Sequence, residues 1–298
     1  MAQRRAIVSG ASGFIGRAVV SELRSEGWVV TTLVRRAAAG QDEVSWDPTT
    51  GTLDPAALSG ADVVINLSGA SISRMPWTSS IRESIRSSRR EATSTLVTAI
   101  NAAKVTPKAF LSGSAVGIYG DRGDSELTDT SARGTGFLAD VTEEWESFAV
   151  AAKCRTVLLR TGLVLGDGGA LTPLRMATAL GVGASVGTGR QWWPWISHRD
   201  EVRAIVHLID STLRGPVNLV GPKPAQSVEV TRELSRVMSR PHLFAIPAFA
   251  IGMLGDAGRE LLLASQKLHP TALEKDGFEF THRTVADALR WAIGEKRR

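Results

Sequence analysis

The feature that most restricts the fold is a glycine-rich turn near the start of the chain. The sequence SGASGFIG follows an apolar run at residues 5–9 and precedes an amphipathic stretch at residues 14–26. A strand that turns sharply into a helix needs residues without a Cβ, and the first N–H groups of that helix form a site for a phosphate group. The spacing G-x-x-G-x-x-G in this position predicts a pyrophosphate-binding turn made by Gly10, Ser12, Gly13, Phe14, Ile15 and Gly16.

Strand-like and helix-like segments alternate after this turn. Apolar runs predict strands at residues 28–34, 62–67, 109–112 and 156–160, and helical spacing predicts helices at 78–103 and 137–152. The runs AIVS, VVINL and TVLL are apolar throughout, which is typical of strands covered on both faces. The sequence therefore predicts an α/β fold with a Rossmann-like, doubly wound parallel sheet.

The alternation ends after residue 165. A glycine-rich segment follows, and most of the chain after residue 222 fits helices, whereas a helix at 199–213 and a strand at 217–219 are expected to return to the main sheet. We expect a dinucleotide-binding domain of residues 1–165 plus about 196–222. A smaller, mostly helical substrate domain would contain about 166–195 plus 223–298.

The composition narrows the class of protein. Of the 298 residues, 43% are hydrophobic and 22% charged, which is typical of a globular protein. The single cysteine, Cys154, lies in no metal-ligand cluster, so we expect no metal site and a reducing, cytoplasmic location. The longest apolar window, 244–254, is shorter than the roughly 20 residues of a membrane span, so no membrane contact is expected. The one dense basic cluster, 82–90, has helical spacing and favours a solvated face over a nucleic-acid site.

The end of the second strand indicates which dinucleotide binds. Arg35 and Arg36 stand about 20 residues after the last glycine, where an acidic residue would favour NAD and an arginine accommodates a 2′-phosphate. We therefore expect NADP(H) as cofactor, although a solvated loop also explains Arg36. The small residues after the strand at 62–67 let the chain pass the cofactor closely, and the expected contacts are Leu67, Ser68 and Gly69.

Six segments together resemble a known superfamily. They are SGASGFIG, NLSGA, SGSAVGIYGD, LRTGLVLG, WISHRDEV and GPVNL, and in this order they resemble the extended, epimerase-like short-chain dehydrogenases/reductases over the whole chain. The segments WDP, SRREATSTL, FLADVTEEWE and GTGRQWWPWI resemble an atypical NADP-binding subfamily. The resemblance implies an NADP(H)-dependent oxidoreductase or epimerase that acts on a small molecule.

One part of the family pattern is missing. The resemblance implies a catalytic tyrosine on the helix at 137–152, with a lysine four residues later. Alignment on Glu146 places Leu138 and Thr142 at these two positions, and neither can exchange a proton with a substrate. The only tyrosine of the chain, Tyr119, is followed four residues later by Gly123. The usual dyad is therefore absent.

Other residues remain candidates for the chemistry. The resemblance places the catalytic serine at Ser114, with Ser112 as the alternative. Tyr119 follows the carboxyl end of a strand, where ligands bind in such sheets, but a packed turn residue is an equally good interpretation. In the segment RQWWPWI, Arg190 and Trp192 are candidates for binding an apolar or aromatic substrate with an anionic group. The alternative is that these tryptophans, Trp193 and Trp195 above all, join the two domains.

Two functions stay open at this point. The first is an NADP(H)-dependent oxidoreductase or epimerase of unknown substrate, with Ser114 holding the substrate oxygen. The second is a non-catalytic NADP(H)-binding protein that senses redox state or regulates a partner. Family members commonly form homodimers through the helices expected at 78–103 and 137–152. The basic face of the first and the acidic TEEWE of the second could pair between two chains or within one.

Overall fold

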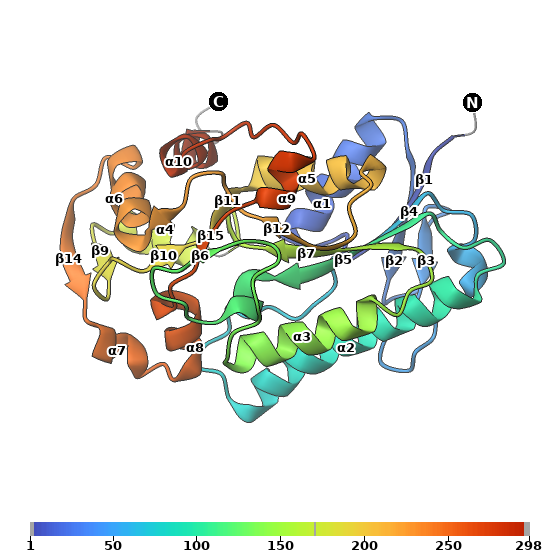
Figure 1. Ribbon diagram of the computed structural model, residues 1–298, viewed down its shortest axis with the longest axis horizontal. Coiled ribbons are helices and arrows are strands. Elements are labelled where there is room, and N and C mark those ends of the chain that lie inside the picture. Colours follow the sequence, from blue (N-terminus) through green and yellow to red (C-terminus); the bar gives the residue numbers. More distant parts are fainter. Residues whose placement is uncertain (1–2, 170, 295–298) are drawn as a thin grey trace.

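The computed structural model describes residues 3–169 and 171–294, and a seven-stranded parallel sheet forms its centre (Figure 1). The strand order is β12-β7-β5-β4-β1-β2-β3, and each neighbouring pair is parallel. This arrangement confirms the predicted Rossmann-like α/β fold. The strands are β1 (Arg5–Ser9), β2 (Val29–Val34), β3 (Glu43–Ser45), β4 (Val63–Asn66), β5 (Ala109–Ala115), β7 (Arg155–Thr161) and β12 (Gly215–Leu219).

Helices cover both faces of the sheet. In Figure 1, α1 (Phe14–Ser25) and α5 (His198–Asp210) lie above the sheet, and α2 (Ser79–Ala102) and α3 (Phe137–Ala149) lie below it. The two helices of each layer also pack against each other. Because a parallel strand is followed by a crossover, this layering is the one expected when strands and helices alternate along the chain.

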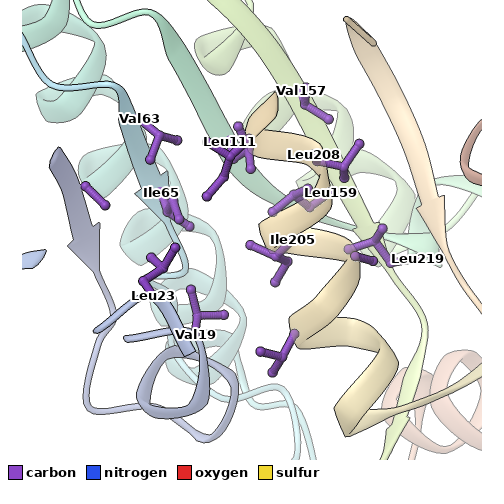
Figure 2. Packing of buried hydrophobic residues seen from close by; sticks show 14 of the residues in the cluster. Val19, Leu23, Val63, Ile65, Leu111, Val157, Leu159, Ile205, Leu208 and Leu219 are labelled. Carbon is purple, nitrogen blue, oxygen red and sulfur yellow. The ribbon is translucent and has the colours of Figure 1, made fainter. Parts of the chain in front are cut away.

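The two core layers follow from the alternation of side chains along each strand. In β4, Val63 and Ile65 belong to the cluster that contains α1 and α5, whereas Val64 belongs to the cluster on the α2 and α3 side. Figure 2 shows the first cluster, where Val19 of α1 and Ile205 of α5 pack over the strands. Burial of each such side chain contributes about 1.5–3 kcal/mol, so apolar residues on both faces stabilise a central strand.

Two elements differ from the sequence-based expectation. The strand β3 was not expected, because its three residues EVS are too few to show an apolar run; β3 pairs with the edge of β2. The strand β5 extends to Ala115, three residues beyond its expected end, and it therefore carries Ser114 within the sheet. The helix α5 and the strand β12 return to the sheet as predicted.

Four small two-stranded sheets and several short helices make up the rest of the described chain, and most of them lie at the left of Figure 1. No helix within the described ranges has the length and apolarity needed to cross a membrane. The strands are β6 (Glu126–Leu127), β8 (Leu163–Leu165), β9 (Gly183–Val186), β10 (Trp192–Trp193), β11 (Trp195–Ser197), β13 (Ala225–Gln226), β14 (His242–Ile246) and β15 (Lys267–Leu268). The helices are η1 (Pro55–Ala57), η2 (Val116–Tyr119), α4 (Leu171–Ala179), α6 (Ser227–Val237), α7 (Ala248–Gly252), α8 (Asp256–Gly258), the π-helix Arg259–Leu263, α9 (Thr271–Lys275) and α10 (Val285–Gly294).

A buried carboxyl group lies in the first turn of α5. Glu201 is fully buried, and its Oε1 accepts a hydrogen bond of 2.8 Å from the Thr161 hydroxyl. The other oxygen, Oε2, has no hydrogen-bond partner in the described part of the chain. Burial raises the pKa of Glu201 to about 8, and the bond from Thr161 offsets only part of this effect. The carboxyl is therefore neutral in the folded protein near neutral pH.

We predict that Glu201→Gln flattens the pH dependence of stability. Because the folded-state pKa of about 8 exceeds the ordinary 4.5, the carboxyl favours folding fully below pH 4.5, and this contribution is lost as the pH rises through 8. Urea unfolding at about pH 5 and about pH 9 measures the free energy of unfolding. Relative to wild type, the variant should be more stable at the higher pH than at the lower by on the order of a few kcal/mol. Glu22→Gln, at an exposed position of α1, is the control. If the free energy of unfolding of wild type and of Glu201→Gln changed equally with pH, Glu201 would not have the raised pKa.

Candidate functional site

The phosphate-binding turn is shaped by close backbone packing. Gly10 has φ +72°, and a Cβ there would lie 2.5 Å from the carbonyl carbon and oxygen of Leu67. A Cβ on Gly16 would lie 2.2 Å from the carbonyl oxygen of Gly10. Both positions therefore require glycine, and the turn is held directly against the loop that follows β4.

The N-terminus of α1 has no side-chain cap among the described residues. Its N-cap, Gly13, offers no side-chain oxygen, and the first turn contains no acidic residue. The aromatic ring of Phe14 is turned away to stack on His198, with ring centroids 4.1 Å apart and an angle of 20° between the rings. The first N–H groups of α1 thus lie at the carboxyl edge of the sheet with the positive end of the helix dipole behind them.

The two arginines after β2 differ in their surroundings. Arg36 forms a two-pronged ion pair with Glu43 of β3, with distances of 2.6 and 2.7 Å. The hydrogen bonds from Arg36 lower the pKa of Glu43 to about 2. Arg35 is exposed, and among the described residues it makes no ion pair. Arg35 is therefore the arginine that remains available at the end of β2.

The predicted serine belongs to a buried polar network. Ser114, on β5, donates a hydrogen bond of 2.5 Å to Oε1 of Glu146 on α3. Arg160 of β7 binds both oxygens of the same carboxylate at 2.8 Å. The hydroxyl of Ser114 is thus already bound to a carboxylate that is shared with a guanidinium. The alternative serine, Ser112, is fully buried and donates weakly, at 3.3 Å, to the Gly113 carbonyl.

Tyr119 belongs to the same network. Its side chain is fully buried, and its hydroxyl accepts a hydrogen bond from Arg160 at 2.8 Å and donates one to Asn218 at 2.7 Å. Burial raises the pKa of Tyr119 above its ordinary value of 10, and the charge of Arg160 offsets this only in part. The geometry favours the interpretation of Tyr119 as a packed turn residue.

A pocket of about 290 Å³ lies next to this network. Its walls come from the turn after β5, from the start of α3 and from the segment around the π-helix, so residues far apart in the sequence meet there. Leu138, at the position expected for a catalytic tyrosine, forms part of the wall. The lining residues are Gly117, Gly120, Asp121, Thr135, Leu138, Arg259, Glu260, Leu263, Ala264 and Gln266.

Glu260 closes the start of α3 inside this pocket. Its two carboxylate oxygens accept hydrogen bonds of 2.8 Å from the backbone N–H groups of Phe137 and Leu138. The N-cap residue of α3 is a glycine without a side chain that could cap the helix, and Glu260 takes over this role. The local sequence does not predict this contact, because Glu260 follows Leu138 by 122 residues.

The tryptophan-rich segment lies outside the pocket walls. Trp192 donates from its indole nitrogen to Asp124 at 2.8 Å, and Arg190 is exposed. Trp193 donates to the Leu262 carbonyl and Trp195 to the Lys223 carbonyl, and both side chains are buried. Within residues 3–169 and 171–294, no group of three or more His, Cys, Asp or Glu residues could hold a metal ion.

Comparison with known proteins identifies the family. A model of the NAD-dependent epimerase/dehydratase family matches residues 6–221, which contain the phosphate-binding turn and, except for Arg5 at the start of β1, the seven strands of the sheet. The chain belongs to this family. The sequence-based resemblance is thereby confirmed. A second model, for a domain of unknown function, matches residues 246–292.

Members of the epimerase family resemble the chain over almost its full length. An epimerase family protein of Mycobacterium tuberculosis is 39% identical, with 98% of each chain covered. A chloroplastic homologue of epimerase family protein SDR39U1 from Arabidopsis thaliana is 34% identical, with 95% of this chain and 85% of that protein covered. The crystal structure of human SDR39U1 with NADPH has a TM-score of 0.88 and 27% identity, covering 97% of this chain and 99% of the human chain.

We predict that Glu260→Ala destabilises this family member by about 1–2 kcal/mol, because two N–H groups at the start of α3 lose their cap. Chemical denaturation of wild type and variant measures the difference. Glu143→Gln is the matched control, since Glu143 lies on an exposed part of the same helix and pairs with Arg133. A loss equal to that of the control would show that Glu260 does not stabilise α3.

Proposed function

We propose that this protein binds NADP(H) across the carboxyl edge of the sheet and uses it in an oxidoreductase or epimerase-type reaction on a small molecule. The observation that carries the proposal is the N-terminus of α1 without a side-chain cap, together with Arg35 at the end of the neighbouring strand β2, where it makes no ion pair among the described residues. The first offers N–H groups to a pyrophosphate, and the second offers a guanidinium to a 2′-phosphate. The NADPH seen with the similar human protein supports the same cofactor.

The strand order supports one direction for the bound cofactor. The strand β2, which ends at Arg35, lies on one side of β1, and β4 and β5 lie on the other side. With the pyrophosphate at α1, the adenosine 2′-phosphate lies over β2. The nicotinamide half then extends over β4 and β5, toward Ser114 and the pocket beside η2. Ser68 and Gly69 would line its path.

The pocket is the proposed substrate site. Its volume of about 290 Å³ suits a small molecule, and its wall combines apolar Leu138 and Leu263 with the charged side chains of Arg259 and Glu260. Such a lining suits a substrate with both an apolar and a polar part. Arg190 and Trp192 stay candidates for contacts outside this wall.

The hydrogen bonds of the expected catalytic groups support a second function, NADP(H) binding without turnover. The hydroxyls of Ser114 and Tyr119 are bound within the protein, and Leu138 and Thr142 occupy the positions of the missing dyad. A protein that binds NADP(H) without turnover, as a redox sensor or regulator, needs none of these groups. This alternative shares the cofactor site and differs only in whether the nicotinamide reacts.

A homodimer through α2 and α3 is a further part of the proposal, together with a cytoplasmic location. The charges considered for this interface already pair within one chain, since Glu144 of α3 lies 3.2 Å from Arg86 and 3.8 Å from Arg90 of α2. Charge complementarity between two chains therefore adds no support, and a dimer would depend on other contacts.

We predict that Arg35→Ala reduces the preference for NADPH over NADH by about tenfold or more, because one charge-assisted contact to the 2′-phosphate is lost. Arg36→Ala is the matched control. It removes the neighbouring arginine, whose guanidinium is held by Glu43, and should change the ratio much less. Titration of both cofactors by nicotinamide fluorescence gives the ratio. If Arg35→Ala leaves it unchanged, the 2′-phosphate is bound elsewhere.

We predict that NADPH is oxidised in the presence of at least one member of a panel of carbonyl compounds and sugar nucleotides. Ser114→Ala should lower kcat/KM for that substrate by about tenfold or more, since a hydrogen bond to the reacting oxygen would be lost. Ser112→Ala, tested in parallel, identifies which serine is used. Tight NADPH binding without oxidation by any compound would instead favour the redox sensor.

A further inference from the structure

A guanidinium group stands beside the loop that follows β4. Arg89, on α2, donates from Nη1 to the carbonyl oxygens of Ala70 and Ile85 at 3.1 and 2.9 Å. A Cβ built on Gly69 would lie 3.3 Å from its Cζ atom. The guanidinium also lies 5.1 Å from the ring centroid of Trp145 on α3. Trp145 in turn packs over Gly113 of β5. The charge of Arg89 is therefore held at the carboxyl edge of β4 and β5.

Arg89 has no acidic partner within the described part of the chain, unlike its neighbours on α2. Arg86 and Arg90 both pair with Glu144. Within the described part of the chain, its side-chain hydrogen bonds go to two neutral carbonyl groups, both from Nη1. Partial burial without a counter-charge lowers its pKa to about 10, which still leaves it charged at neutral pH. A guanidinium has five N–H donors, so most of the donors of Arg89 are left for another acceptor.

The strand order of the sheet indicates which ligand atoms would accept hydrogen bonds from Arg89. Arg35 stands at the end of β2, on one side of β1, and Arg89 stands beside β4 and β5, on the other. A dinucleotide whose 2′-phosphate is at Arg35 and whose pyrophosphate is at α1 brings its second nucleotide to Arg89. Resting on the proposed cofactor site, we infer that Arg89 binds the oxygen atoms of the nicotinamide nucleotide half of NADP(H) and positions that half over β5.

The neighbours of Arg89 suit this role. Gly69 is exposed and has no side chain, so a ligand can reach the guanidinium across it. The Ala70 carbonyl and the Trp145 ring restrict the guanidinium on two sides, and an oriented fork of donors binds oxygen atoms more selectively than a flexible ammonium group. The nearby turn of α3 carries Thr142 and provides no cation of its own.

The test compares Arg89→Gln with wild type for two ligands, NADPH and 2′,5′-ADP. The second ligand contains the adenosine half with its 2′-phosphate and lacks the nicotinamide nucleotide. We expect Arg89→Gln to weaken NADPH binding by about tenfold and to leave the affinity for 2′,5′-ADP unchanged. Arg90→Gln is the control on the adjacent residue and should change neither affinity. Circular dichroism and thermal unfolding verify that each variant is folded.

Each outcome decides between the alternatives. Unchanged NADPH affinity in Arg89→Gln, or an equal loss for both ligands, would overturn the inference. Failure of wild type to bind NADPH would instead overturn the proposed function itself. If Arg89→Gln does not fold, Arg89→Lys keeps the charge and the aliphatic stem but lacks the fork. We then expect weaker NADPH binding with 2′,5′-ADP unaffected, and wild-type affinity for NADPH in that variant would overturn the inference as well.

Discussion

The ion pair between Arg160 and Glu146 is the interaction on which the site depends most. It joins β7 to α3, and its guanidinium also donates to the Tyr119 hydroxyl and to the Asp129 carbonyl. Both partners of the pair are largely buried, so the loss of either one would leave the other charge buried without a partner, at a large cost in free energy. The pair holds α3 against the strands and sets where the start of that helix meets the turn after β5.

The same ion pair explains why the expected catalytic hydroxyls have structural partners. Ser114 and Tyr119 both bond to members of the pair, and Asn218 extends the network to β12. On the pocket side, α3 offers Leu138, while Thr142 is buried and donates to the Leu138 carbonyl at 2.7 Å. The helix that would hold a proton donor in the wider superfamily thus presents an apolar wall whose N-terminus is closed by Glu260.

The sequence was informative where a function depends on neighbouring residues. The glycine turn, the apolar strands and the end of β2 are local patterns, and the structure has them within a few residues of their predicted bounds. The partners of Arg36, Arg89 and Glu260 could not be predicted in this way. Glu43 lies on a strand too short to show a pattern, and Glu260 reaches α3 from a distant segment. The sequence does not distinguish Arg89 from Arg86 and Arg90, which both pair with Glu144.

The positions that we propose to bind the anionic dinucleotide lie on three different elements, and none of them is α3. The turn before α1 is held by its own backbone contacts, Arg35 follows β2, and Arg89 belongs to α2. The groups that would transfer a proton, in contrast, depend on α3 and on the network around Arg160. Substitution on α3 can therefore remove proton transfer without weakening the cofactor site. This separation explains how the chain can have the glycine turn and Arg35 after β2 while Leu138 and Thr142 occupy the tyrosine and lysine positions.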